Sequence, residues 1–181
     1  MADLFVDPGL NTIQTAINAA NNTSGDRVIL RNGTYTFNTS QAMLFASAVT
    51  GTLFTNLTVM AENPGLAILN LTGVGFDAIY GDNATGVTIK DIVLTGTPSS
   101  GGVVRDHADS PMTGWTFQNI TLNAMNKTFF DRPTVAPGVG ITIKNITTTA
   151  LYNALYVINV FGPATNLDMV IDGVDARLHV A

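Results

Sequence analysis

The sequence contains no cysteine and few charged residues. Without cysteine among its 181 residues, disulfide frameworks and thiolate metal sites are excluded, and the redox compartment stays open. Only 12% of residues are charged, the net charge is −5, and no basic block is present, so we expect no binding to nucleic acid or to an anionic membrane. No apolar run approaches the ~20 residues of a membrane span, and the first residues are unlike a signal peptide. The length predicts one domain, residues 1–181.

What the chain does contain is an internal repeat. Residues 86–96 have the same pattern as residues 114–124 and 140–150, and residues 169–176 form a weaker copy. Two earlier segments, residues 57–59 and 28–30, fit the start of the unit at steps of 30 and 29. Each copy alternates apolar and polar residues, as short strands do. Repeats at intervals of 26 to 30 residues predict a solenoid of about six coils.

Within each repeat, the alternation breaks once, at a residue type that tolerates left-handed backbone geometry. The break positions are Asp91, Asn119, Asn145 and Gly173. The apolar positions that we expect to face inward are Val87, Trp115, Ile141, Met169, then Ile89, Phe117, Ile143, Ile171, and then Ile92, Ile120, Ile146, Val174. A bend stacked on itself once per coil favours an all-β, single-stranded, right-handed parallel β-helix. The first 25 residues include a short amphipathic helix that we expect to cap it, with Asn11 and Gln14 as a capping box.

The entry to the coils carries a family resemblance. The pattern Gly25-Asp26-x-Val28-x-Leu30-x-x-Gly33-x-Tyr35 after a small helix resembles the pectin-lyase-like right-handed β-helices. That superfamily includes pectate lyases, polygalacturonases, sugar epimerases and phage tailspike modules. The resemblance therefore implies the fold and leaves the function open.

A further strand column is expected between the main repeats. Ile79, Val104, Phe130 and Tyr156 recur at steps of 25, 26 and 26, and we predict that they face inward. The neighbouring file, which we expect to face outward, consists of Val103, Phe129 and Leu155, with Val157 beside it. Such an apolar file predicts a partner surface or a sugar platform. Lateral packing of three copies would bury it, so we expect a homo-oligomer, a trimer, at the extracellular or virion surface.

The candidate chemistry lies next to this file. Asp106, His107 and Asp131 are the candidate catalytic acid and base groups, and a uronate would be held by Arg105 and Arg132. Tyr80 and Phe129 are the candidate sugar platforms. Residues 103–109 partly resemble the Val-Trp-Ile-Asp-His segment of pectate lyases, with Val104 and Arg105 in place of Trp and Ile. The alternative interpretation pairs Arg105 with Asp131 and Asp106 with Arg132 as structural ion pairs.

Two further interpretations stay open. Scattered Asp residues could collect oxygen ligands for calcium, although no calcium-binding nonapeptide is present and we expect neither a metal nor another cofactor. A threonine file could bind ice or simply favour strand structure, and it consists of Ile29, Thr58, Thr88, Thr116, Thr142 and Val170.

The sequence thus favours a structural or carbohydrate-recognition β-helix of the tailspike type. The alternative is a lyase, glycoside hydrolase or epimerase that acts on a uronate-containing polymer.

Overall fold

The computed structural model describes most of the chain as a parallel β-solenoid. The described residues are 2–20, 25–46, 54–82, 84–106, 112–132, 139–149, 157–160 and 168–175. The elements in chain order are β1 (Asp3–Val6), α1 (Thr12–Ala19), β2 (Arg27–Leu30), β3 (Gly33–Thr36), β4 (Met43–Ala46), β5 (Thr58–Ala61), β6 (Ala67–Asn70), the 3₁₀ turn η1 (Leu71–Gly73), β7 (Ile79–Asp82), β8 (Thr88–Lys90), β9 (Val93–Thr95), β10 (Val104–Asp106), β11 (Thr116–Asn123), β12 (Phe130–Arg132), β13 (Val139–Thr148), β14 (Ile158–Val160) and β15 (Asp168–Asp175). No helix in these ranges is long and apolar enough to cross a membrane.

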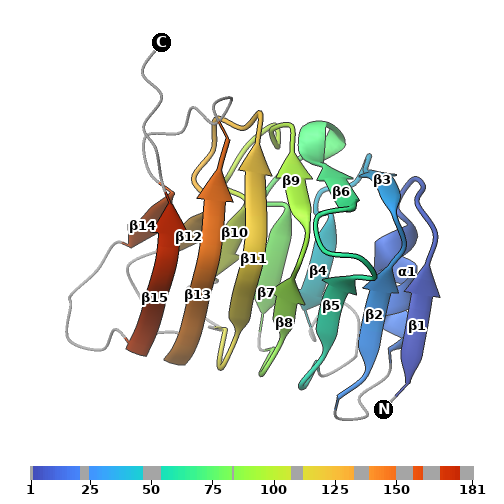
Figure 1. Cartoon of the computed structure of the whole chain (residues 1–181), viewed down its shortest axis with the longest axis horizontal. Coiled ribbons are helices and arrows are strands. Elements are labelled where there is room, and N and C mark those ends of the chain that lie inside the picture. The colour runs from blue at the N-terminus through green and yellow to red at the C-terminus, as the bar shows by residue number, and fades with distance from the viewer. Residues whose placement is uncertain are drawn as a thin grey trace.

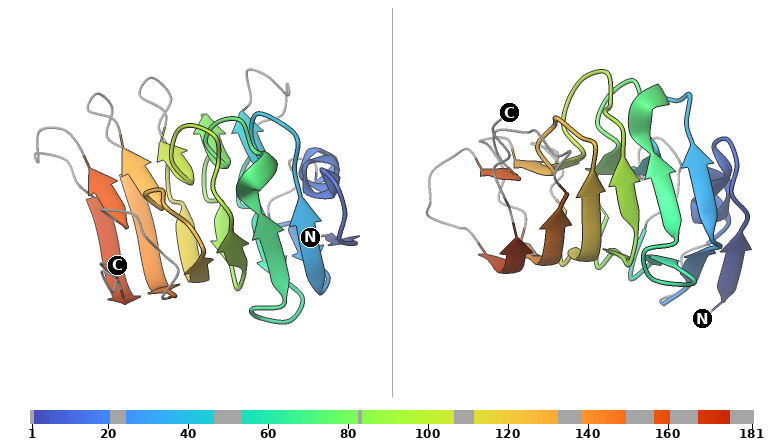
Figure 2. Two further views of the ribbon diagram at one scale, coloured as in Figure 1. Left: turned by 90° about the horizontal axis from the view of Figure 1, so that it is seen from above. Right: turned by 45° about the horizontal axis from the view of Figure 1, so that its top comes forward.

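The strands form two sheets that face each other across the core (Figure 1, Figure 2). The ten-stranded sheet runs β1-β2-β5-β8-β11-β9-β6-β3, and β13 and β15 extend it beyond β11. The five-stranded sheet runs β14-β12-β10-β7-β4. Successive coils stack in chain order along one axis and make about four turns, so the expected six coils are not confirmed. The right-handed sense of the coil stays a prediction.

The repeat predicted the stacking of the later coils correctly. Thr88 pairs with Thr116, and Thr116 with Thr142, in parallel register. The predicted bend residues Asp91, Asn119 and Asn145 all have positive φ angles, of 63°, 53° and 52°. They also lie on top of one another, because the Asn119 amide donates to Asp91 at 2.7 Å and the Asn145 amide donates to Asn119 at 2.9 Å.

The register of the first coil differs from the prediction. Val28 pairs with Val59 and not with Leu57, so the first step is 31 residues. The threonine file therefore begins at Arg27, which pairs with Thr58, whereas Ile29 pairs with Met60. Residues 62–66 form an insertion between β5 and β6, where later coils have a single bend residue. This insertion follows β5, so it leaves the step from β2 to β5 unchanged.

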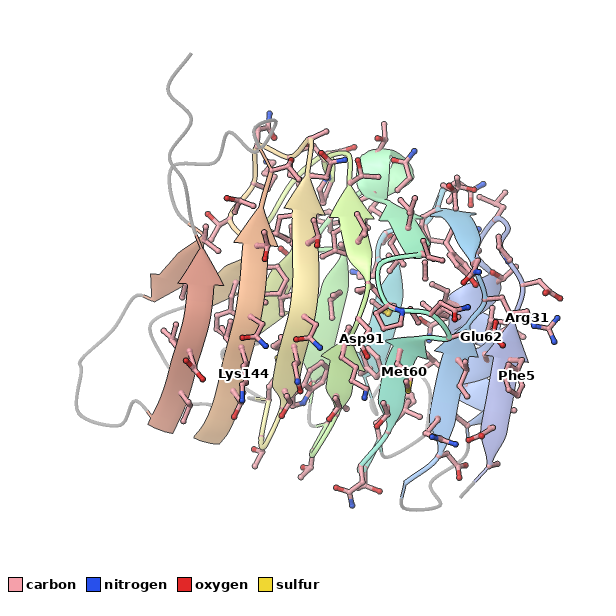
Figure 3. The ribbon with its side chains drawn as sticks, viewed as in Figure 1. Phe5, Arg31, Met60, Glu62, Asp91 and Lys144 are labelled. Atoms are coloured by element: carbon pink, nitrogen blue, oxygen red, sulfur yellow. The ribbon has the colours of Figure 1, made fainter. Side chains whose placement is uncertain are left out.

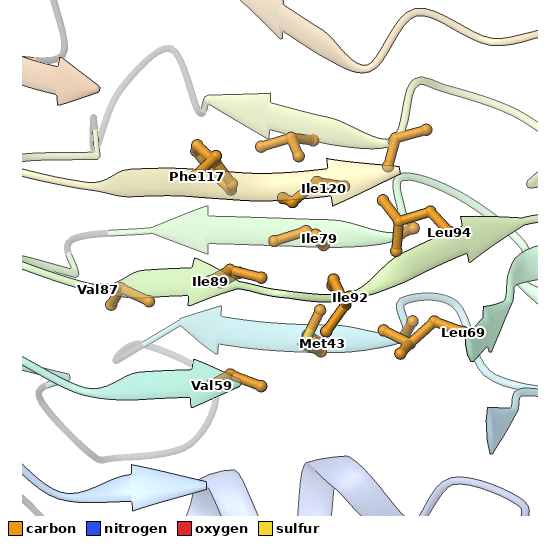
Figure 4. Close-up of a cluster of buried hydrophobic side chains, with 14 of the residues drawn as sticks. Met43, Val59, Leu69, Ile79, Val87, Ile89, Ile92, Leu94, Phe117 and Ile120 are labelled. Atoms are coloured by element: carbon orange, nitrogen blue, oxygen red, sulfur yellow. The ribbon is translucent and has the colours of Figure 1, made fainter. Parts of the chain in front are cut away.

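The core lies between the two sheets and is built from the predicted inward columns (Figure 4). Ile79 and Met43 from the five-stranded sheet are fully buried, as are Ile89 and Phe117 from the ten-stranded sheet. Burying each such side chain contributes about 1.5–3 kcal/mol to stability. Trp115 is also buried, as expected for core, and its indole N–H donates to the Ala84 carbonyl at 2.8 Å. In the last described coil, Ile171 is 51% exposed although it continues an inward column.

The outward apolar file is wrong. Val103 and Phe129 are fully buried and Val157 is 9% exposed, while Leu155 lies outside the described residues. Two consecutive residues point inward at this corner, because Val103 and Val104 are both buried, and so alternation alone misplaces the first of each pair. The predicted column also slips at its end, because Phe130 pairs with Ile158 and not with Tyr156. These three residues, on which the predicted trimer contact depended, are therefore buried inside the protein.

Candidate functional site

The candidate site lies on the outer face of the five-stranded sheet. Arg105 pairs in register with Tyr80 on one side and with Asp131 on the other. Asp131 in turn pairs with Asn159. Adjacent strands are about 4.8 Å apart, so an aromatic residue, a cation and an acidic residue follow one another in one row across β7, β10 and β12. Three of the predicted site residues, Tyr80, Arg105 and Asp131, are thus brought together.

Strand alternation explains why this row is accessible. Ile79 and Val104, which precede Tyr80 and Arg105, are fully buried in the core. Successive side chains in a strand point to opposite faces. Tyr80 and Arg105 are accordingly half-buried on the outer face, and the Arg105 side chain is 43% exposed.

A buried carboxylate lies beneath Arg105. Asp77 is 6% exposed, and its Oδ1 accepts a hydrogen bond from the Gly102 backbone N–H at 2.7 Å. Its Oδ2 is 3.9 Å from Arg105 Nη1. Gly101 makes this packing possible, since a Cβ there would lie 2.2 Å from Asp77 Oδ1. The ion pair to Asp77 is long and involves Nη1, and the guanidinium has further N–H donors that this contact does not occupy.

The remaining predicted residues have different outcomes. Asp106 pairs in register with Gly81, and Arg132 pairs with Val160, so both backbones belong to the sheet. The side chains of Asp106, Asp131 and Arg132 are not described, and His107 lies outside the described residues.

Phe129 is not a sugar platform. It is fully buried, and its ring packs edge-on against Phe117 at a centroid distance of 5.7 Å. Arg105 and Asp131, which we expected to form a structural ion pair, do lie in register on adjacent strands. The ion pair observed for Arg105, however, is with Asp77.

Sequence reasoning missed one exposed aromatic near the site. Phe76 is 56% exposed and immediately precedes Asp77, the partner of Arg105. Its position in Val74-Gly75-Phe76-Asp77, at the entry to a strand column, is the signal that could have identified it. Phe76 replaces Phe129 as the aromatic candidate at this edge of the sheet.

The described residues contain no group of three or more His, Cys, Asp or Glu side chains able to hold a metal ion.

No protein-family model matches the sequence, and the search of curated proteins found no match. The structure of the PL6 family alginate lyase AlyGC superposes with a TM-score of 0.53 over 82% of this chain, at 19% sequence identity. The likeness is one of fold. The matched part is 20% of the alginate lyase chain, so the present chain spans about a fifth of that protein.

Proposed function

We propose that this chain is a carbohydrate-recognition β-solenoid that binds an acidic polysaccharide along the row of Tyr80, Arg105 and Asp131. The observation that carries the proposal is the register of β7, β10 and β12, which places Tyr80, Arg105 and Asp131 side by side on adjacent strands. Arg105 would bind a uronate carboxylate, because its guanidinium is planar and offers paired donors. Tyr80 would pack against the sugar ring next to it. The fold likeness to an alginate lyase supports this class of ligand.

Binding can be measured by electrophoresis through native gels that contain alginate, pectate or a neutral glucan. We expect retardation by the acidic polymers and weaker retardation of Arg105→Ala. Arg27→Gln is a matched control, because the Arg27 side chain is 40% exposed, similar to Arg105, but is held by Asp3 through two hydrogen bonds of 2.7 and 2.6 Å. Equal retardation of wild type and Arg105→Ala would contradict the site.

A second candidate function is polysaccharide cleavage, which the fold likeness specifically favours. In a β-elimination, a base removes the proton next to the uronate carboxylate and the glycosidic oxygen leaves. Arg105 would neutralise the carboxylate, and His107, Asp106 or Asp131 would transfer the protons. The unsaturated product absorbs in the ultraviolet. Product formation that is lost in His107→Ala and Asp131→Asn would establish this function, whereas binding without product would leave recognition alone.

A further inference from the structure

A second ordered row lies on the outer face of the ten-stranded sheet, away from the candidate site. Strand pairing aligns one outward residue from each of β1, β2, β5, β8, β11, β13 and β15. These residues are Phe5, Ile29, Met60, Lys90, Gln118, Lys144 and Asp172. Figure 3 shows Phe5, Met60 and Lys144 at one level across the face of the sheet. We call this set the front row.

One end of the front row is an open apolar platform. Phe5 is 52% exposed, and the guanidinium carbon of Arg31 lies 5.5 Å from its ring centroid. Arg31 is held in place by Asp7 at 2.9 Å. The cation covers one side of the ring, so the rest of the exposed ring can pack against the C–H groups of a sugar. Met60 lies two strands away and is half-buried, and Ile29 between them is 8% exposed, so Phe5 is the open part of this platform.

The other part of the front row carries two lysines, on β8 and β13. Lys90 Nζ is 3.7 Å from the carboxylate of Asp91. That carboxylate is buried and already accepts a hydrogen bond from Asn119, so the charged group exposed at this point of the row is the lysine ammonium. Lys144 is 46% exposed and 4.0 Å from Asp172. Both ion pairs are longer than a hydrogen bond and leave donors free. The two lysines are two strands apart, about 10 Å, with Gln118 between them.

This chemistry fits a glycan better than a protein partner. A stable protein interface needs about 800 Å² per partner with an apolar centre in which lysine is depleted. The apolar part of the front row is short, and Ile29 within it is only 8% exposed. A second outward file runs beside the front row on the same strands and is polar. It consists of Thr58, Thr88, Thr116 and Thr142, which pair in register. Lys90, Gln118 and Lys144 instead place donors on three adjacent strands, and this arrangement matches a linear polymer that lies along the solenoid axis.

We propose that the front row is a second polysaccharide-binding track. A linear acidic glycan lies across the strands, with a sugar ring on Phe5 and carboxylates at Lys90 and Lys144. The ligand class rests on the proposed function, whereas the residues are independent of the Tyr80, Arg105 and Asp131 row.

The test compares retardation in alginate and pectate gels for variants of each face. Lys90→Gln/Lys144→Gln is expected to weaken binding about tenfold, because each exposed ion pair contributes modestly. Phe5→Ala is expected to weaken it about fivefold. Lys90→Arg/Lys144→Arg retains both charges and is expected to bind like wild type. Leu10→Ala is the control for Phe5, because Leu10 is 55% exposed and lies off the row.

The outcomes separate the two proposals. Front-row variants that bind like wild type overturn the track, while the Arg105→Ala result decides the first site on its own. An arginine double variant as weak as the glutamine variant would also overturn it, since charge would then not be the cause. If sedimentation shows that wild type self-associates and Phe5→Ala is monomeric, the row is an interface between copies and the track is wrong.

Discussion

Asp91 sets the direction of the side-chain ladder, because a carboxylate can only accept hydrogen bonds. Asn119 must donate its amide N–H to Asp91, which leaves the Asn119 oxygen to accept from Asn145. The next position is Gly173, where a Cβ would lie 2.6 Å from the Asn145 oxygen. Backbone strain and side-chain pairing therefore act at the same residues, and each can be removed separately.

Asn119→Ala removes both ladder hydrogen bonds. It also places alanine, which has no polar side chain to stabilise left-handed geometry, at a φ of 53°. The strain is about 1–2 kcal/mol and each net hydrogen bond about 0.5–1.5 kcal/mol. We expect the free energy of unfolding to fall by about 2–5 kcal/mol in denaturant titrations. Asn119→Gly loses the hydrogen bonds without the strain and should be about 1–2 kcal/mol more stable than the alanine variant. Equal stability of the two variants would show that the left-handed bend costs nothing.

Tyr35 gives the fold an alkaline limit. Its hydroxyl is buried and contacts the carbonyl oxygens of Val6 at 2.7 Å and Arg31 at 2.9 Å. Burial, with a smaller effect of the Asp7 charge, raises the pKa of Tyr35 from 10.0 to about 12. The unfolded chain then loses the proton first, so the stabilisation is complete below pH 10.0 and is lost as the pH rises to about 12. We expect the difference in unfolding free energy between wild type and Tyr35→Phe to shrink over this range. A constant difference would contradict the assignment.

At the residue scale, the sequence predicted the bend residues because Asp, Asn and Gly all tolerate left-handed backbone geometry. The sequence could not predict Asp77 as the partner of Arg105. The two residues belong to neighbouring coils and Asp77 lies at a corner between strands, so their contact does not recur with the period of the repeat. The same corner is why Val103 and Phe129 were wrongly expected to face outward.

At the scale of the element, α1 closes one end of the five-stranded sheet. Ile13 and Ile17 are fully buried, and Gln14 lies beside the β4 edge. The Gln14 side chain accepts from the Leu44 N–H at 2.7 Å and donates to the Leu44 carbonyl at 3.0 Å. It thus imitates a neighbouring strand at an edge that would otherwise expose unpaired groups. The capping box expected for Asn11 and Gln14 is wrong, because Asn11 makes no side-chain cap and Gln14 bonds to the sheet.

Gln14→Leu should therefore open the β4 edge. Two hydrogen bonds between the Gln14 side chain and the Leu44 backbone are lost, and the free energy of unfolding should fall by about 1–3 kcal/mol. Hydrogen exchange at the Leu44 amide should accelerate more than at amides inside the sheet. Asn18→Ala is the control, because it removes only the helix-surface contact of Gln14 with Asn18. Equal exchange at Leu44 in wild type and Gln14→Leu would show that the side chain does not protect this edge.

The helix was predictable from the spacing of its apolar residues, and its contact with β4 was not. The distance in sequence from Gln14 to Leu44 is 30 residues, and nothing local marks the glutamine as a strand mimic. The register of β2 with β5 was missed for another reason, because their step of 31 residues is longer than the 26 to 30 residues of the repeats recognised in the sequence.

At the scale of the whole molecule, the two sheets face each other across one core, so their outer faces point away from each other (Figure 1). The period predicted this parallel solenoid, but it could not say which face binds a ligand, because both faces follow the same alternation. If both proposed rows bind an acidic glycan, one protein can hold two polymer chains at once, and this gives a behaviour that neither row gives alone.

Wild type should then cross-link alginate or pectate in solution. Turbidity or viscosity should rise with protein, pass through a maximum, and fall when every polymer site has its own protein molecule. Arg105→Ala and Lys90→Gln/Lys144→Gln should each still bind through the intact face and yet form no cross-links. Combining the two changes should add their binding losses, because groups on opposite faces share no partners. Cross-linking that persists in both single-face variants would mean that the two contacts lie elsewhere, and simple saturation in wild type would mean that only one face binds.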